Sequence, residues 1–336
     1  MLSQKRSESP NVANSEQWSD EDFRLAVDVA NQYYVDNKSK VDIADAVGLT
    51  RFQVGRIPQE AVRSGVVRIE IGLPGKADDT LSTQLQQALG IERAVVVNAS
   101  VDSYAMAVEQ VGAALAEVLS EEVVEGSTLG LAWSRTLDSM SRKLTQLRPC
   151  TVVQLAGHLH VPGADSGSVE IVRQTAAVSG GHAHPIYAPM IVHDAATARS
   201  LRTLPEVANT LAHAARVDLA VASIGAWQPG TSQLFDAVPR ESADQARARG
   251  AVGEVAGRLF DAAGRPVNCD VDDRVIAVTL DNLRDASPVI LSGFGDYRAQ
   301  ATRGALRATG AQVLVADTTL ARALIEEASA STQAPG

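Results

Sequence analysis

Cysteine and aromatic residues are scarce in this chain, and long apolar runs are missing. Two cysteines, Cys150 and Cys269, in 336 residues exclude a disulfide framework and a cysteine-based zinc site, and a reducing cytoplasm is the simplest compartment for such a protein. Aromatic residues are only 4%, so the core must be built from Ala, Val, Leu and Ile. No apolar run reaches membrane-spanning length, and the N-terminus lacks the apolar core of a secretory signal. We therefore expect a cytoplasmic protein without a membrane partner.

Basic side chains are outnumbered, since 30 Lys and Arg face 40 Asp and Glu, which gives a net charge of −10. The deficit is uneven: residues 38–70 carry six basic and four acidic side chains, whereas the segments on both sides are net acidic. A small positive block on an acidic protein fits a polyanion contact that is confined to this block. Chance variation in surface charge is the alternative.

The chain is too long for one ordinary domain, and local composition divides it into three parts. Residues 1–17 are rich in Ser, Asn, Gln and Glu, which predicts a disordered tail. Glycine and proline at positions 72, 74 and 75 mark a boundary. We therefore expect a small domain over 18–75 and a larger one over 76–330.

Residues 40–57, KVDIADAVGLTRFQVGRI, have the pattern of a helix-turn-helix that binds DNA. Ala44 is the small residue that such a motif needs where its helices cross, and Gly48 tolerates the positive φ of the turn. Thr50 with Gln53 predicts a capping box for the second helix. Apolar side chains fall at the spacing that locks the two helices together: Ile43, Val47, Leu49, Val54 and Ile57.

The outward positions of this motif supply the predicted DNA contacts. With Val54 and Ile57 facing inward, Arg51, Phe52 and Arg56 face outward, where Arg can bind guanine and Phe can touch a thymine methyl group. Hydroxyl groups and helix N-termini can hold phosphate. The predicted DNA-contacting set is Ser39, Lys40, Thr50, Arg51, Phe52, Gln53, Arg56 and Gln59. A helical hairpin that touches no DNA is the alternative.

Three further features concern the ends of this motif and the segment that follows it. Ser39 with Asp42 caps the first helix. Pro58 removes a helical hydrogen bond and clashes with the preceding turn, so the second helix either ends near Ile57 or kinks there. The alternating residues 66–71 predict a strand, which would be the wing of a winged helix.

From Arg93 onwards, short apolar runs alternate with helical stretches. Strands separated by helices form right-handed βαβ units, so we expect a doubly wound parallel α/β domain that binds ligands at the carboxyl ends of its strands. Leu81, Leu85 and Leu89 line one face of a preceding helix, which is a linker or a self-association surface. The runs lie at 94–97, 128–132, 151–156, 218–225, 288–293 and 312–317, with helices such as 104–119, 166–178, 204–215 and 296–308 between them.

Together these segments resemble the SorC/DeoR-type sugar-binding transcriptional regulators, from about residue 20 to 328. The resemblance implies a winged helix-turn-helix joined to a domain shaped like phosphosugar isomerases and CoA transferases, with catalysis lost and sugar binding kept. It also implies a homotetramer. Besides the helix-turn-helix, it is carried by GSTLGLAWSRTL (126–137), VVQLAGHL (152–159), IYAPMIV (186–192), DLAVASIGAW (218–227), GAVGEVAGRLFDAAGRPV (250–267) and VILSGFGDYRAQATRGALRATGAQVLVAD (289–317).

The predicted effector site lies where strands give way to loops or helices. Ser134, Arg135 and Thr136 stand at a strand–helix junction, where amides, hydroxyls and a guanidinium can hold a phosphate or a polyol, although an ordinary helix cap is the alternative. The family often has lysine at the position of Arg298. Ala156 replaces a residue that is a Schiff-base lysine in some members, so no covalent adduct is expected there. Further predicted contacts are Gly157, His158, Gly225, Gly293 and Gly295.

We expect no cofactor and no metal ion. His158 with His160, and His182 with His184, have the spacing of zinc ligands on a strand, but the family has no metal there and polar loop histidines are the better interpretation. Trp133 can pack against a sugar ring or form a wall of the fold.

Two functions fit these observations. The first is a transcriptional regulator of carbohydrate metabolism, not an enzyme, whose partners are operator DNA, a sugar, polyol or sugar-phosphate effector, and further copies of itself. The second is a phosphosugar isomerase-like enzyme with an appended helical domain. It would need a positioned acid/base pair, for which Glu254, Asp261 and Asp296 are candidates, but it would not need residues 39–71.

Overall fold

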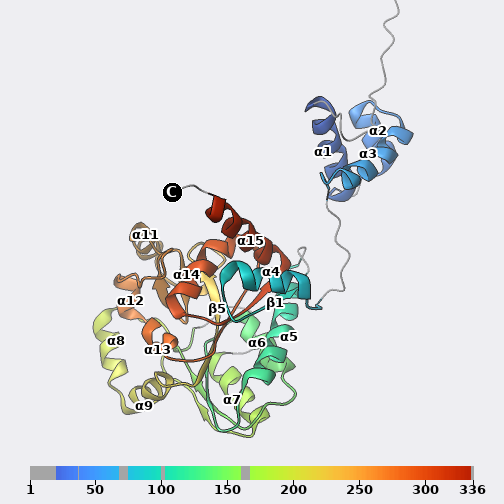
Figure 1. Cartoon of the computed structure of the whole chain (residues 1–336). Helices are drawn as coiled ribbons and strands as arrows, with labels where there is room; N and C mark the ends of the chain where they lie inside the picture. The colour runs from blue at the N-terminus through green and yellow to red at the C-terminus, as the bar shows by residue number, and fades with distance from the viewer. Residues whose placement is uncertain (1–19, 37, 68–74, 100–102, 160–166, 334–336) are drawn as a thin grey trace, which may run out of the picture. The chain divides into compact units, whose positions relative to one another are not determined.

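The computed structural model describes residues 20–36, 38–67, 75–99, 103–159 and 167–333. The chain divides into two compact units, 1–72 and 73–336, which are described separately (Figure 1). The predicted tail and most of the predicted wing strand lie outside the described residues. Within the described residues, no helix is both long and apolar enough to cross a bilayer.

The described part of the first unit consists of three helices around a small aliphatic core. Ala44 is buried where the second and third helices pack together, and all the predicted locking side chains belong to the same cluster. The helices are α1 (Asp20–Tyr34), α2 (Lys40–Val47) and α3 (Arg51–Arg63). The cluster consists of Ala26, Val29, Ile43, Ala44, Val54 and Ile57, with Leu25, Tyr33, Val47 and Leu49 packed against it.

The turn between α2 and α3 has the predicted conformation. Gly48 ends α2 with a φ of 68°, which only glycine adopts without strain, and its amide donates to the Ala44 carbonyl. Thr50 and Gln53 form a complete capping box, in which each side chain accepts a hydrogen bond from the other residue's backbone amide. The Ser39 hydroxyl caps α2. The helix-turn-helix geometry is therefore confirmed.

Helix α3 continues through Pro58 to Arg63, so of the two alternatives the end near Ile57 is wrong. The proline ring is buried together with Val54, Ile57 and Ala61. A proline inside a helix costs about 3 kcal/mol, while burial of an apolar side chain stabilises by about 1.5–3 kcal/mol. Core packing of the ring and of Ala61 one turn later thus offsets the lost hydrogen bond.

The second unit is built on a sheet with the strand order β1-β9-β8-β5-β2-β3-β4, in which every neighbouring pair is parallel. The six predicted strands are confirmed, and the short edge strand β4 was not predicted. The strands are β1 (Arg93–Val97), β2 (Thr128–Leu131), β3 (Thr151–Gln154), β4 (Ala183–His184), β5 (Leu219–Ala226), β8 (Val289–Gly293) and β9 (Val313–Asp317).

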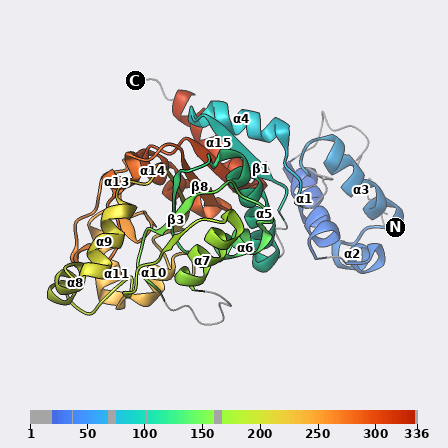
Figure 2. The same ribbon diagram turned by 90° about the horizontal axis from the view of Figure 1, so that it is seen from below.

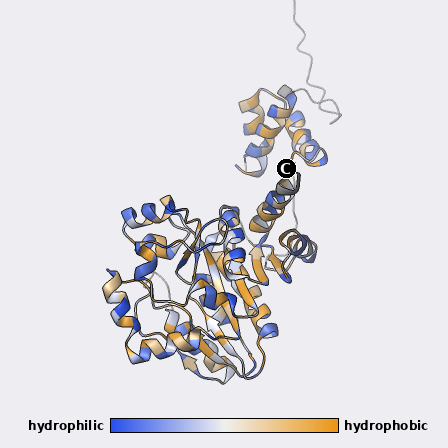
Figure 3. Ribbon diagram, turned by 60° about the vertical axis from the view of Figure 1, so that its left-hand side comes forward, coloured by the Kyte–Doolittle hydropathy of each residue, from blue (hydrophilic) through white to orange (hydrophobic). Residues whose placement is uncertain are grey.

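Helices cover both faces of this sheet, as a doubly wound fold requires (Figure 2). In β9, Val313 and Val315 join the cluster on one face, whereas Leu314 and Ala316 join the cluster on the other. The strands are consequently mostly apolar, while the helices carry both apolar and polar residues (Figure 3). One face holds α5 (Tyr104–Glu122), α6 (Arg135–Lys143) and α7 (Ser168–Ser179), and the other holds α9 (Pro205–Ala214), α14 (Ala299–Thr309) and α15 (Thr318–Gln333).

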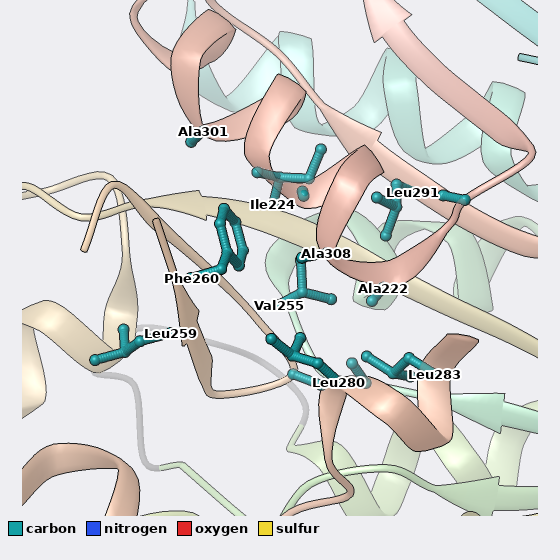
Figure 4. Close-up of a cluster of buried hydrophobic side chains, with 14 of the residues drawn as sticks. Ala222, Ile224, Val255, Leu259, Phe260, Leu280, Leu283, Leu291, Ala301 and Ala308 are labelled. Carbon is teal, nitrogen blue, oxygen red and sulfur yellow. The ribbon is translucent and has the colours of Figure 1, made fainter. Parts of the chain in front are cut away.

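An antiparallel hairpin of β6 (Gly253–Val255) and β7 (Arg258–Phe260) extends from the end of β5. Its Val255 and Phe260 pack with Ile224 and Ala301 in the larger core cluster (Figure 4). The hairpin is therefore fixed to the sheet. The remaining elements are α8 (Ala195–Arg202), α10 (Gln233–Ala237), α11 (Arg240–Ala248), α12 (Asp270–Arg274), α13 (Leu280–Arg284) and the 3₁₀ turn η2 (Asp296–Arg298).

The leucine-lined helix that begins the second unit, α4 (Asp79–Leu89), is covered by the chain itself. Leu81 and Leu85 are buried in the same cluster as Leu320 and Leu324 of α15, and Leu89 packs against that cluster. The expectation of a linker or self-association surface on this face is therefore wrong. The period of the leucines gave the buried face correctly but did not identify what covers it.

Candidate functional site

The sheet changes its direction of winding between β2 and β5. From β2 the chain adds β3 and β4 on one side, while β5, β8 and β9 build the other side. At such a switch point the loops leave neighbouring strands in opposite directions and open a crevice. A cavity of about 310 Å³ lies there, lined by the ends of β2, β5 and β8, the start of α6, the segment 230–237 and the β6–β7 hairpin.

A row of three hydroxyl groups crosses the floor of this cavity. The Ser134 and Ser223 hydroxyls share a hydrogen bond of 2.8 Å, and those of Ser223 and Ser292 share one of 2.7 Å. Ser134 also accepts the Leu137 amide at 3.0 Å and thereby caps α6. The helix-cap role and the cavity-lining role of Ser134 are thus both present. Because a hydroxyl both donates and accepts hydrogen bonds, this row can bind either donors or acceptors of a ligand.

Glu254 places a carboxyl group in the cavity wall. Its Oε2 accepts the Gly257 amide at 2.9 Å, and its Oε1 accepts the Ser232 hydroxyl at 3.3 Å. Burial raises the pKa of the Glu254 carboxyl, and these two donors together with the charge of Arg298 oppose that shift only in part. A carboxyl with only two hydrogen-bond donors keeps lone pairs for the hydroxyl groups of a ligand.

Gly225 and Gly293 also line the cavity, at the ends of β5 and β8. A Cβ at Gly225 would lie 2.4 Å from the Glu254 Oε1, because the sheet pairs Gly225 directly with Glu254. A Cβ at Gly293 would lie 3.2 Å from a methyl group of Leu320. The missing side chain at Gly225 therefore makes room for the carboxyl group, rather than for a ligand alone.

Arg298 lines the cavity from η2 but is almost fully committed to protein groups. Its guanidinium donates to the Phe294 carbonyl at 2.5 Å, to the Tyr297 hydroxyl and to the Thr231 carbonyl at 3.4 Å. It also lies 4.7 Å and 4.6 Å from the ring centres of Phe294 and Tyr297. Arg298 is 5% exposed, so its main effect is to fix two loops of the wall.

Arg135 is the less committed cation of the cavity. Its guanidinium lies 5.8 Å from the ring centre of Tyr104, and within the described residues it has no hydrogen-bond or ion-pair partner. It stands in the first turn of α6, whose free amides favour negative charge. Thr136 is buried and lines the cavity beside it, as does the half-buried Trp133.

Three predicted contacts lie off the cavity lining. A Cβ at Gly157 would lie 2.6 Å from the Pro189 carbonyl oxygen, so this glycine serves a close approach of two backbone segments. His158 is exposed, with its Nδ1 3.4 Å from the Ser168 hydroxyl. Gly295 has a φ of 83° and donates its amide to Asp317. The structure thus gives Gly157, His158 and Gly295 no place among the cavity residues.

The histidine pairs do not assemble a metal site in the described part of the chain, where no group of three or more His, Cys, Asp or Glu side chains is placed to hold a metal ion. His184 stacks edge-on against His213 at 4.9 Å. Burial, followed by the charges of His213 and His182, lowers the pKa of His184. His160 lies outside the described residues.

The three acid/base candidates are not brought together. Glu254 lines the cavity, but Asp261 accepts the backbone amides of Ala263 and Arg265 and holds a turn. Asp296 accepts the amide of the next residue. Asp236, which was not predicted, does line the cavity, where its carboxylate accepts the Gly230 amide at 3.0 Å.

Sequence reasoning missed several lining residues, and two of them had a readable signal. Ser223 and Ser292 each interrupt an otherwise apolar run near its carboxyl end, and the sheet pairs them directly. Two polar residues at matching places on buried strands predict a shared polar site. Tyr104 and Ser232, by contrast, stand at the N-terminal ends of α5 and α10, whose approach to the cavity depends on tertiary structure.

A second candidate surface lies on α3. Phe52, Arg56, Gln59 and Arg63 are exposed, and their spacing of four, three and four residues places them on one face, opposite the buried Val54–Ile57–Ala61 side. We call these four residues the outer face of α3. Arg51 is exposed beside it, and among the described residues neither Arg51 nor Arg56 has an ion-pair partner.

The remaining predicted DNA contacts lie around the N-termini of α2 and α3. Ser39 and Thr50 are exposed and hold the two caps. Gln53 is partly buried because its side chain completes the capping box. The Lys40 ammonium lies 5.5 Å from the ring centre of Tyr33. The Gln53 side chain is already engaged, because its Oε1 accepts the Thr50 amide at 2.9 Å.

Comparison with known proteins gives consistent matches along the chain. The family described as "Putative sugar-binding domain" matches residues 75–326. The deoxyribonucleoside regulator of Bacillus subtilis (strain 168) is 25% identical over 306 residues, which cover 90% of this chain and 98% of that protein. The regulator LsrR of Escherichia coli (strain K12) is 28% identical over 319 residues, covering 93% and 98%. The crystal structure of the full-length sorbitol operon regulator SorC from Klebsiella pneumoniae superposes with a TM-score of 0.66 at 22% identity, covering 91% and 99%.

Proposed function

Because the chain belongs to the SorC/DeoR-type family of sugar-binding transcriptional regulators, we propose that a small ligand in the switch-point cavity controls its binding to operator DNA. One observation carries this proposal: the cavity is walled by three linked hydroxyls, a carboxyl group and an uncommitted arginine. These are the groups that recognise a hydroxylated, optionally phosphorylated molecule.

The effector class follows from how these groups are distributed. The serine row and Glu254 offer donors and acceptors for sugar or polyol hydroxyls. Arg135 and the N-terminus of α6 offer positive charge for a phosphate. A sugar, polyol or sugar phosphate fits this distribution, with its hydroxyl-bearing part toward Glu254.

The proposal assigns DNA binding to the first unit. Its helix-turn-helix presents two arginines without ion-pair partners in the described residues, on a segment of net positive charge in an acidic protein. The matches to relatives named as regulators cover 90% and 93% of this chain, so they extend into this unit. A helix-turn-helix protein reads two half-sites as a dimer, and a homotetramer is the assembly that we propose.

We propose that the chain is not an enzyme. Glu254 is the only one of the three predicted acid/base groups that lines the cavity, and its neighbours Ser232 and Gly257 hold it by hydrogen bonds. An isomerase-like alternative predicts turnover of a phosphosugar that binds the protein. Incubation of the protein with each ligand found below, followed by chromatography of the products, tests this directly.

A thermal-shift screen of sugars, polyols and their phosphates tests the proposed effector class. A ligand that binds only the folded state at 100 times its Kd stabilises it by about 2.7 kcal/mol, which is a readily measured shift. We expect at least one compound to raise the unfolding temperature of the wild type. Glu254→Leu, which keeps the volume but loses the acceptors, should lose that shift. A screen without any hit would contradict the proposal.

A further inference from the structure

The outer face of α3 combines one large apolar side chain with polar and basic ones. Phe52 lies in the first turn of the helix, Arg56 and Gln59 follow along the same face, and Arg63 ends it. With 1.5 Å of rise per residue, the face is about 16 Å long. A helix with its side chains is about 10–12 Å across, so α3 can enter a DNA major groove, which is about 12 Å wide.

Phe52 is unusual in its exposure. It is 87% exposed, more than any other large hydrophobic residue in the described part of the chain, the next being Val35 at 73%. A Phe with its ring in water forgoes about 1.5–3 kcal/mol of burial free energy. No contact within the described fold recovers that free energy, because the ring points away from the Val54–Ile57 core.

The surroundings of Phe52 indicate what covers it. Arg51 precedes it, Arg56 lies one helical turn along the same face, and both lack an acidic partner among the described residues. An apolar protein partner at this place would have to accommodate both charges, whereas DNA supplies phosphates around its groove. Within the major groove, the apolar feature of a base pair is the C5 methyl group of thymine.

We propose that Phe52 is a specificity-determining residue that packs against a thymine methyl group in each operator half-site. This inference rests on the proposed operator binding and adds a base preference to it. The ring has no hydrogen-bonding group, so it selects thymine by apolar contact alone, while Arg56 on the next turn is placed to contact a neighbouring base or phosphate.

The test uses the full-length protein and a library of random DNA duplexes. Selection with the wild type defines a bound sequence, in which each thymine is then replaced in turn by uracil. Uracil pairs identically but lacks the methyl group. Affinities are measured by fluorescence anisotropy at one fixed salt concentration for the wild type, Phe52→Ala and Phe52→Leu.

We expect one thymine per half-site at which uracil weakens wild-type binding about three- to fivefold, the size expected for one apolar methyl contact. The same exchange should change binding of Phe52→Ala by less than about 1.5-fold, and Phe52→Leu should keep part of the effect. Equal thymine dependence in the wild type and Phe52→Ala, or its absence from both, overturns the role of Phe52. A library in which no sequence is enriched overturns operator binding itself, so the two failures are distinguishable.

Discussion

At the scale of single residues, the cavity contains two cations with different tasks. Arg298 is held by the Phe294 and Thr231 carbonyls and two aromatic rings, whereas Arg135 rests on Tyr104 without a hydrogen-bond partner in the described residues. A guanidinium that donates three hydrogen bonds to protein groups holds the wall in shape. One without such bonds is available for a ligand.

This difference gives opposite expectations for two matched variants. Arg135→Ala should weaken binding of the best phosphorylated ligand about tenfold or more, since a charge-assisted hydrogen bond contributes about 1.5–3 kcal/mol, and should leave its unphosphorylated counterpart nearly unaffected. Arg298→Ala should lower the free energy of unfolding by a similar amount, because the buried Phe294 carbonyl and the partly buried Thr231 carbonyl lose their donor. Calorimetry and urea unfolding measure the two quantities. If Arg298→Ala, and not Arg135→Ala, selectively lost affinity for the phosphorylated ligand, the roles of the two arginines would be reversed.

Glu254 makes the stability of the protein depend on pH. Its carboxyl pKa is raised in the folded protein, first of all by burial, so the folded state binds this proton more tightly than the unfolded state does. Well below pH 4.5 the group is protonated in both states and does not affect the free energy of unfolding. As the pH rises above the ordinary value of 4.5, the unfolded state ionises first and the folded state is destabilised until the pH passes the raised pKa.

Glu254→Gln should therefore gain stability relative to the wild type as the pH rises from about 4 to 8. Urea unfolding of both proteins across this range measures the difference, and Glu109→Gln is a control with the opposite shift, because Lys143 lowers the pKa of Glu109. If the free energies of unfolding of Glu254→Gln and wild type differed by the same amount at all pH values, the raised pKa of a buried carboxyl would be contradicted.

At the scale of elements, the sequence predicts the helix-turn-helix and the parallel strands because each depends on local rules. Gly48, Thr50 and Gln53 specify the turn through one positive φ and one capping box. A strand that is buried on both faces is mostly apolar, so β5, β8 and β9 are visible in the sequence even though Ser223 and Ser292 interrupt two of the runs.

Elements with three or fewer residues are not visible in this way. The β6–β7 hairpin and β4 are too short for any period to be read, although Ala256 and Gly257, both with positive φ, mark the hairpin turn. The position of Glu254 in the cavity depends on this hairpin. Its place among the cavity residues therefore could not be predicted from sequence spacing. The hydrogen bond from Arg298 to the Thr231 carbonyl could not be predicted either, because it joins two loops that are far apart in the sequence.

The turn of the helix-turn-helix offers an isolated test of local backbone strain. A Cβ at Gly48 would meet nothing within 4 Å, so any loss on substitution comes from its φ of 68° alone. Gly48→Ala should destabilise the turn by about 1–2 kcal/mol, and Gly48→Asn by less, because Asn tolerates this region. Hydrogen exchange of the α2 and α3 amides in the full-length protein should speed up about five- to thirtyfold in the Ala variant. Exchange rates in that variant equal to those of the wild type would contradict the turn geometry.

At the scale of the whole molecule, the two units divide the proposed tasks. The second unit begins before α4, because the Gly75 amide donates to the Asn98 carbonyl and the Asp78 amide donates to the Val96 carbonyl at the end of β1. A cut at residue 73 keeps both hydrogen bonds, whereas a cut at 78 loses the first.

The fragment 73–336 should fold, keep the ligand affinity of the full-length protein and lose all sequence-selective DNA binding, because the cavity is lined by residues of this unit alone. Circular dichroism, calorimetry and anisotropy measure the three properties. Loss of ligand affinity in a fragment with an unchanged circular dichroism spectrum would show that the first unit contributes to the site.

The most direct measurement of the central claim is the operator affinity of the full-length protein with and without the ligand found in the thermal-shift screen. A saturating ligand should change the Kd for the selected duplex by about five- to 150-fold, the range of a typical coupling free energy of 1–3 kcal/mol. Glu254→Leu should bind the duplex as the wild type does and show no ligand effect. An operator affinity that is identical with and without bound ligand would contradict the account.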